Sequence, residues 1–279
     1  MMQRRHFMGG AAGVAGLAAA LPLLAAERAT DLPNLAGKAV PISAAERKTR
    51  IAKATMLMRE ADINALLIEP GSSLIYFTGV EWWRSERLTA AVLTREGEVA
   101  IVTPFFEEPS VRETLGIEAV VLTWNEDENP LVAVAAWLGK RGLAKGRVAV
   151  EETVRYFAVD GLQLAMPDAT IVNGAPVVRG CRMHKSPAEI ALMQIAADIT
   201  IAAYAHAVPR VEAGMTPAAI GALVNSATRA LGGNPEFELI LLGEASAYPH
   251  GSGKPQAVRV GEVVLMDCGC SLDGYQSDI

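Results

Sequence analysis

The chain has 279 residues, a formal net charge of −6 and 51% apolar residues, a composition typical of a globular protein long enough for two domains. Because basic residues do not cluster beyond the N-terminal segment, we do not expect it to bind nucleic acid. The three cysteines are an odd number, which argues against a framework of structural disulfides.

The N-terminal segment has the pattern of an export signal. Arg4 and Arg5, followed by Phe7, precede an uncharged stretch from Gly9 to Ala26 that is rich in Ala, Gly and Leu. We predict a twin-arginine signal peptide over residues 1–26, and with it a periplasmic or secreted location. A membrane anchor is the alternative, but so many Gly and Ala residues make a poor spanning helix, so no stable anchor is expected.

After a predicted linker over residues 27–42, strands and helices alternate through residues 43–175, which predicts an α/β domain. The predicted helices are Ser43–Ala61, Glu107–Leu115, Pro130–Gly139 and Tyr156–Leu164. The predicted strands are Ala65–Ile68, Ala90–Thr94, Val99–Val102, Ala119–Leu122 and Arg147–Glu151. A domain change is predicted near residues 173–180, so that a second domain occupies residues 176–279.

Two helices are predicted to open the second domain. Ser186 and Glu189 have the spacing of a capping box, and Pro187 between them suits the first helical position. The apolar positions that then recur at helical spacing are Ile190, Met193, Ala197 and Ile201. A second helix is predicted from Thr216–Pro217 to near Gly232–Gly233.

The last residues predict a β-hairpin. Val263–Met266 is an apolar strand, and Asp273–Gly274 is a strong signal for a two-residue turn. If Leu272 pairs with Tyr275, Asp267 lies diagonal to Asp278 on one face of the hairpin, roughly 7 Å away. A four-residue loop would place the two Asp residues directly opposite, whereas a three-residue loop would break this geometry. Cys268 and Cys270 alternate with Asp267, so we expect both to face the core.

Two carboxylates on one face repel each other unless a cation compensates. Asp267 follows four apolar residues, and an acid there is costly to bury without a partner, a role that a divalent cation can fill. The alternative is that Asp267 caps a strand end and that Asp278 is a solvated surface residue. For two Asp residues at this spacing alone, that alternative is favoured.

At these positions the chain resembles the pita-bread metallopeptidase family, which includes Xaa-Pro aminopeptidases, prolidases and methionine aminopeptidases, with creatinase as a metal-free relative. The segments that carry the resemblance are His250, Gly261–Gly269 and Gly274–Ile279. Arg182–Met193 resembles the start of the family's catalytic domain. Met58–Ile68 and Tyr76–Gly79 resemble the N-terminal domain of the aminopeptidase P, prolidase and creatinase branch, so the similarity covers residues 43–279.

The resemblance implies an α/β creatinase-like N-terminal domain followed by an α+β pita-bread catalytic domain. It implies that Asp267 and Asp278 bind two divalent metal ions, with manganese expected and cobalt or zinc as alternatives. It also implies that His250 contacts substrate and stabilises the tetrahedral intermediate. The family's remaining ligands, one His and two Glu, lie beyond the second Asp and are absent from this sequence. We therefore expect an incomplete catalytic domain, an N-terminal fragment that is inactive by itself.

The implied activity is hydrolysis of the peptide bond before proline, by an exported peptidase whose substrates have proline at the second position. A non-catalytic pita-bread binding protein is one alternative. A creatinase-like amidinohydrolase is another, although retention of both Asp residues argues against it.

A homodimer is expected. Trp82–Trp83–Arg84, in a predicted loop after Gly79, could form a subunit contact or shape a substrate entrance, and the subunit contact is preferred because interfaces are enriched in Trp and Arg. His184 and His206 are not expected to be metal ligands, because neither lies at a short ligand spacing from another His or Cys.

Overall fold

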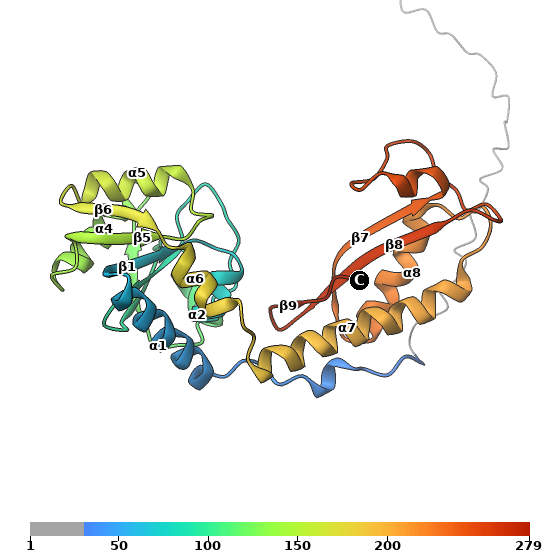
Figure 1. Cartoon of the computed structure of the whole chain (residues 1–279), viewed down its shortest axis with the longest axis horizontal. Coiled ribbons are helices and arrows are strands. Elements are labelled where there is room, and N and C mark those ends of the chain that lie inside the picture. The colour runs from blue at the N-terminus through green and yellow to red at the C-terminus, as the bar shows by residue number, and fades with distance from the viewer. Residues whose placement is uncertain (1–30) are drawn as a thin grey trace, which may run out of the picture.

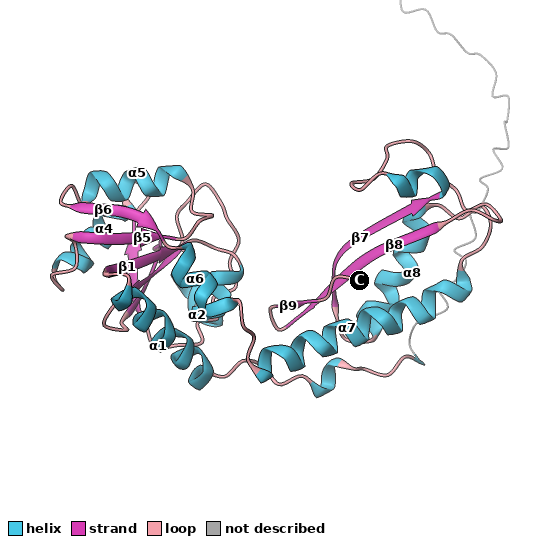
Figure 2. Ribbon diagram, in the orientation of Figure 1, coloured by secondary structure: helices cyan, strands magenta, loops and turns pink. Residues whose placement is uncertain are grey.

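The structure, a computed structural model, describes residues 31–279, so the predicted signal peptide over residues 1–26 lies outside the described residues. Two lobes are joined where helix α7 begins (Figure 1). The first lobe contains a six-stranded sheet and the second a three-stranded sheet. Each lobe combines helices with its sheet (Figure 2), which confirms the expected α/β domain followed by an α+β domain.

The sheet of the first lobe has the strand order β4-β3-β2-β1-β5-β6. Its strands are β1 (Ile63–Ile68), β2 (Ala90–Thr94), β3 (Val99–Pro104), β4 (Val120–Trp124), β5 (Gly146–Val150) and β6 (Ala169–Asn173). Strand β1 is antiparallel to β2 and parallel to β5. Nearly every residue of β1 is apolar and buried, as expected for a central strand that helices cover on both faces.

Helices pack on both faces of this sheet. One core contains residues of α1 (Ala44–Glu60), α2 (Ser72–Thr78), α3 (Glu108–Thr114) and α6 (Ala175–Arg182), and the other contains residues of α4 (Pro130–Gly139) and α5 (Tyr156–Ala165). Strand β1 serves both cores because its side chains alternate: Leu66 and Ile68 lie in the first core, and Ala65 and Leu67 in the second.

The predicted helices and strands of this lobe are confirmed to within a few residues, but α2, β6 and α6 were not predicted. Helix α6 buries Val177, Val178 and Cys181 in the first core, so the first lobe extends to Arg182, beyond the predicted limit at residue 175. Gly180, at the end of the predicted domain boundary, lies inside α6. A Cβ atom there would lie 2.9 Å from Leu57 Cδ1, so glycine allows α6 to pack closely on α1.

The second lobe packs two helices on one face of an antiparallel sheet of order β7-β8-β9. Its elements are α7 (Pro187–Ala207), α8 (Pro217–Ala230), β7 (Asn234–Leu242), β8 (Val264–Leu272) and β9 (Tyr275–Gln276). The predicted capping box begins α7: the Glu189 N–H donates to Ser186 Oγ at 3.2 Å, and the Ser186 N–H donates to the Glu189 carboxylate at 2.9 Å. By length and composition alone Pro187–Arg210 could cross a membrane, but the buried face of α7 lies at the centre of the second core, as in a core helix of a globular domain.

The described part of the predicted linker is docked on the second lobe. The N–H groups of Leu35 and Ala36 both donate to the carbonyl oxygen of Leu231, at 2.9 and 3.3 Å, and Leu32 packs against the second core. Figure 1 shows this segment running beside α7 before the chain enters α1. Gly37 lies in the short 3-10 helix η2 (Ala36–Lys38), so the prolines and glycine that are typical of a linker are compatible with a docked segment.

Candidate metal centre

Strands β8 and β9 form the predicted hairpin. Asp273 and Gly274 both have positive φ, 48° and 81°, which is the backbone that a two-residue type I′ turn requires. Leu272 pairs with Tyr275 as predicted. The pairing continues beyond β9, since Cys268 and Ile279 exchange two backbone hydrogen bonds, at 3.1 and 3.2 Å. Gly269 is therefore opposite Asp278, and the predicted diagonal placement of Asp267 and Asp278 on one face is confirmed.

The opposite face of the hairpin is held by α7. Ser277 and Thr200 are joined through their hydroxyl groups at 2.8 Å, and the Tyr204 hydroxyl donates to the carbonyl oxygen of Ile279 at 2.7 Å. Cys268 and Cys270 are buried in this core, as predicted, and burial raises the pKa of the Cys268 thiol. Cys268 therefore packs on the face of the hairpin opposite to Asp267 and Asp278.

Asp267 is partly exposed and Asp278 is exposed. In residues 31–279, neither carboxylate takes part in an ion pair or a side-chain hydrogen bond. Both are therefore free to accept a cation, and carboxylate oxygens suit manganese. No group of three or more His, Cys, Asp or Glu side chains close enough to hold a metal ion is found among the described residues. The two Asp residues suit part of a metal site, but in the described residues they do not complete one.

Gly269 lies between the two Asp positions, and a side chain there would collide with the Phe237 ring and the Ser277 carbonyl oxygen. We expect Gly269→Ala to destabilise the protein by about 1–3 kcal/mol, because backbone must move to relieve the overlap. Urea unfolding measures the change. Gly253→Ala is the matched control, since a Cβ atom at Gly253 meets nothing within 4 Å. Equal stability of the two variants would contradict the close packing at Gly269.

His250 lies in the exposed loop after the short helix η4 (Gly243–Ala247) and lines a cleft of about 710 Å³ together with Leu239 and Leu241. A Cβ atom at Gly251 would lie 3.5 Å from Leu239 Cδ1. Leu239 pairs with Asp267 across β7 and β8, so their side chains share one face of the sheet. The fold thus brings the His250 loop to the face that carries Asp267.

A second pocket, of about 760 Å³, lies between the lobes. Trp82 and Trp83 line it with their rings stacked at 5.0 Å, and Trp83 is 70% exposed. Tyr275 of the hairpin and Arg50 of α1 line the same pocket. Sequence patterns did not single out these two residues, because an arginine in a helix and a tyrosine in a hairpin each resemble ordinary surface positions.

Two family models match consecutive parts of the chain. The creatinase/prolidase N-terminal domain matches residues 50–184, and the metallopeptidase family M24 matches residues 191–279. The gap between the two matches falls at the junction of the lobes, where α7 begins.

Individual proteins show the same similarity. An uncharacterised peptidase of Schizosaccharomyces pombe is 32% identical over 263 residues, which cover 88% of this chain and 56% of that protein. The Xaa-Pro aminopeptidase of Escherichia coli is 29% identical over 175 residues, 60% of this chain and 39% of that protein. The crystal structure of dipeptidase PepE from Mycobacterium ulcerans matches with a TM-score of 0.76 and 29% identity, over 86% of this chain and 64% of its own. The chain therefore spans less than two thirds of each of these relatives.

Proposed function

Because this chain belongs to the metallopeptidase family M24 and carries the N-terminal domain of its creatinase and prolidase members, we propose that it acts in an exported, metal-dependent peptidase that hydrolyses the bond before proline. Similarity to a dipeptidase and to an Xaa-Pro aminopeptidase supports a peptide substrate, and the name of the second enzyme is the support for proline at the second position.

The observation that carries the proposal is the placement of Asp267 and Asp278. Both lie within the M24 match, on the one face of the hairpin that the helices do not cover, and neither carboxylate has an ion-pair partner in residues 31–279. Two carboxylates so placed favour a divalent cation between or beside them. We assign two ions to the complete site, with manganese preferred over cobalt and zinc.

When bound, such ions lower the pKa of a water molecule and polarise the scissile carbonyl group. Asp267 and Asp278 would hold them through carboxylate oxygens. His250, in the loop over the same face of the sheet, would hydrogen-bond the substrate and the negative charge that develops on the carbonyl oxygen. Because fewer than three donors gather in the described residues, we propose that residues 1–279 by themselves bind metal weakly and hydrolyse no peptide.

The test is a hydrolysis assay on protein that carries the complete M24 domain, using two peptides that differ only in proline or alanine at the second position. We expect the proline peptide to be cleaved, the activity to be lost after chelation, and Mn²⁺ to restore it. Protein that holds metal but cleaves neither peptide would support the alternative of a non-catalytic binding protein.

Export is also part of the proposal. Arg4 and Arg5 followed by Phe7 support the twin-arginine route, which carries folded proteins and would let a metal site be filled in the cytoplasm. Replacing both arginines with lysine should leave the protein in the cytoplasm, which cell fractionation checks. A normal periplasmic yield of the Lys-Lys variant would argue against this route.

We also propose that the protein forms a homodimer. The stacked Trp82 and Trp83 rings, with Trp83 70% exposed, offer a large aromatic surface of the kind enriched at interfaces. Sedimentation velocity of the wild type and of Trp83→Ser would show whether this surface holds two subunits together.

A further inference from the structure

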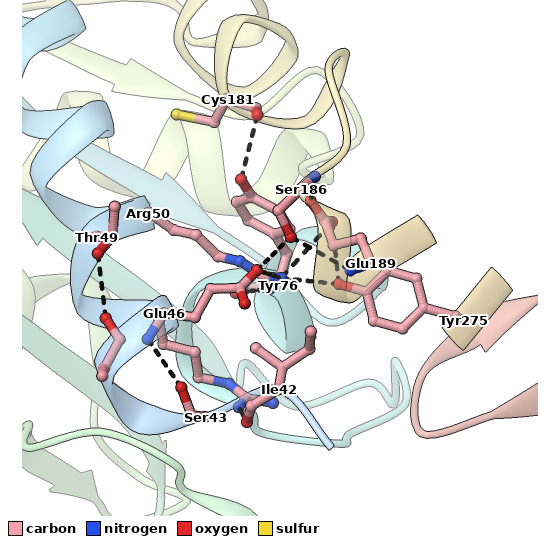
Figure 3. A network of polar contacts seen from close by, with 12 residues as sticks. Ile42, Ser43, Glu46, Thr49, Arg50, Tyr76, Cys181, Ser186, Glu189 and Tyr275 are labelled. Carbon is pink, nitrogen blue, oxygen red and sulfur yellow. Dashed lines mark hydrogen bonds and ion pairs between the residues drawn. The ribbon is translucent and has the colours of Figure 1, made fainter. Parts of the chain in front are cut away.

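A buried polar network joins the two lobes beside the turn of the hairpin (Figure 3). Arg50 of α1, 5% exposed, donates to the Glu46 carboxylate at 2.8 Å, to the Tyr275 hydroxyl at 2.9 Å and to the Tyr76 carbonyl oxygen at 3.0 Å. The Tyr275 hydroxyl donates in turn to the Glu189 carboxylate at 3.0 Å. Glu189 is 3% exposed and lies 3.6 Å from the Arg50 guanidinium.

The network also holds the start of α7. The Ser186 hydroxyl donates to Glu46 at 2.6 Å, while Ser186 and Glu189 form the capping box of α7. Arg50 is thus shared by the carboxylates of Glu46 and Glu189, and the Tyr275 hydroxyl links Arg50 to Glu189. Burial, opposed by Arg50, raises the pKa of Tyr275 to about 12, so its hydroxyl stays protonated and can donate to Glu189.

Tyr275 connects this network to the hairpin of the candidate metal centre. Strand β9 has two residues and a single neighbouring strand, so the sheet alone holds it weakly. The side chains of Tyr275 and Ser277 and the carbonyl oxygen of Ile279 contact α7, and of these three residues Tyr275 alone reaches the first lobe, through Arg50. Asp278 follows Tyr275 by three residues, roughly 10 Å of extended chain.

We infer that Arg50 and Tyr275 are positioning residues, through which the first lobe fixes the hairpin that carries Asp267 and Asp278. The role of the two Asp residues in metal binding rests on the proposed function. The first lobe supplies neither of these carboxylates, yet it contacts the hairpin that carries them, through Arg50 at Tyr275 and through Ile75 beside Gly274. The alternative is that the network only stabilises the junction between the lobes, without a specific effect on the hairpin. A small substitution in the network distinguishes the two roles by its effect on the stability of the hairpin.

Tyr275→Phe and Tyr76→Phe form a matched pair. Each removes one hydroxyl group from a tyrosine at the junction and keeps the ring; Tyr76 is buried and Tyr275 is partly buried. The Tyr76 hydroxyl donates to the Cys181 carbonyl oxygen at 3.1 Å, so both partners belong to the first lobe. The Tyr275 hydroxyl connects the hairpin to α7 and α1.

The experiment measures amide hydrogen exchange and Mn²⁺ binding in the wild-type chain and in both variants. The reporter amides are those of Ser277 and Ile279, which donate across the hairpin to Cys270 and Cys268. We expect Tyr275→Phe to speed their exchange about 5- to 10-fold, because the hydroxyl group makes two hydrogen bonds, to Arg50 and Glu189, while amides of β7 are unchanged. Mn²⁺ affinity should fall about tenfold, the scale seen when a residue that supports metal ligands is lost. Tyr76→Phe should change neither quantity.

The outcomes separate the two proposals. Unchanged exchange at Ser277 and Ile279 in Tyr275→Phe, or an equal change in Tyr76→Phe, would overturn the positioning role. Faster hairpin exchange in Tyr275→Phe alone would support the positioning role even in a chain that binds no Mn²⁺. A lack of Mn²⁺ binding by protein that carries the complete M24 domain would overturn the proposed metal site.

Discussion

Replacing Asp267 with Asn should remove most of the bound metal from protein that carries the complete M24 domain, whereas His250→Ala should leave the metal content unchanged. Asp267→Asn removes one of the negative charges that would hold the ions. His250→Ala should lower kcat/KM for an Xaa-Pro peptide by about 100-fold or more, because it removes one donor to the developing oxyanion. Metal analysis of the purified proteins and steady-state kinetics measure both effects.

The comparison between these two variants distinguishes the assigned roles. Metal loss in His250→Ala would indicate that His250 is a metal ligand and not a group that contacts substrate. Full metal content and activity in Asp267→Asn would show that Asp267 is not a metal ligand. The alternative that Asp267 caps a strand end is already excluded, because Asp267 lies inside β8 and pairs with Leu239. Both variants alter side chains on the exposed face of the second lobe, so large losses of stability are not expected from either.

Arg50→Met should destabilise the protein by about 3–5 kcal/mol, the usual effect of removing one partner of a buried ion pair. The variant leaves the carboxylate of Glu189 buried and without its cation, and it also removes the donor to the Tyr76 carbonyl oxygen. Urea unfolding at neutral pH measures the loss. Arg59→Met is the matched control on the same helix, because Arg59 pairs with Glu96 at an exposed position, where such pairs contribute about 0–1 kcal/mol. Similar losses in both variants would contradict the importance of the network.

The same network should make stability depend on pH. Burial tends to raise the pKa of Glu46, but hydrogen bonds from Ser186 and Arg50 outweigh it, so the pKa is held below 4.5. A carboxyl group whose pKa is depressed by folding stabilises the protein above its unfolded pKa, and this stabilisation is lost as the pH falls through its folded pKa. We therefore expect a loss of stability below pH 4.5 that is smaller in Arg50→Met, which lacks one of the groups that depress the pKa.

Local sequence signals predicted the elements whose determinants lie within a few residues of each other. The capping box of Ser186 and Glu189 begins α7, and Asp273–Gly274 forms the turn that sets the register of the hairpin. From that register followed the shared face of Asp267 and Asp278. A two-residue turn fixes the register in which the two strands of a hairpin pair. The alternation of side chains along each strand then determines the face on which each side chain lies. The resemblance to the M24 family, carried by these same residues, was confirmed.

Elements held by distant contacts were missed. Helix α6 contains Gly180, a residue that usually interrupts helices, and its place in the first lobe depends on contact with Leu57, more than a hundred residues earlier. Strand β7, which no pattern had singled out, pairs with β8 and brings Leu239 and the His250 loop to the face of Asp267.

The sequence by itself thus determined the order of the two domains, the hairpin and the two carboxylates on its open face, because each depends on neighbouring residues. Only the tertiary structure decided that residues 31–42 dock on the second lobe and that Arg50 meets Tyr275, 225 residues away. Burial of a charged group depends on which distant partners surround it, and no local pattern contains that information.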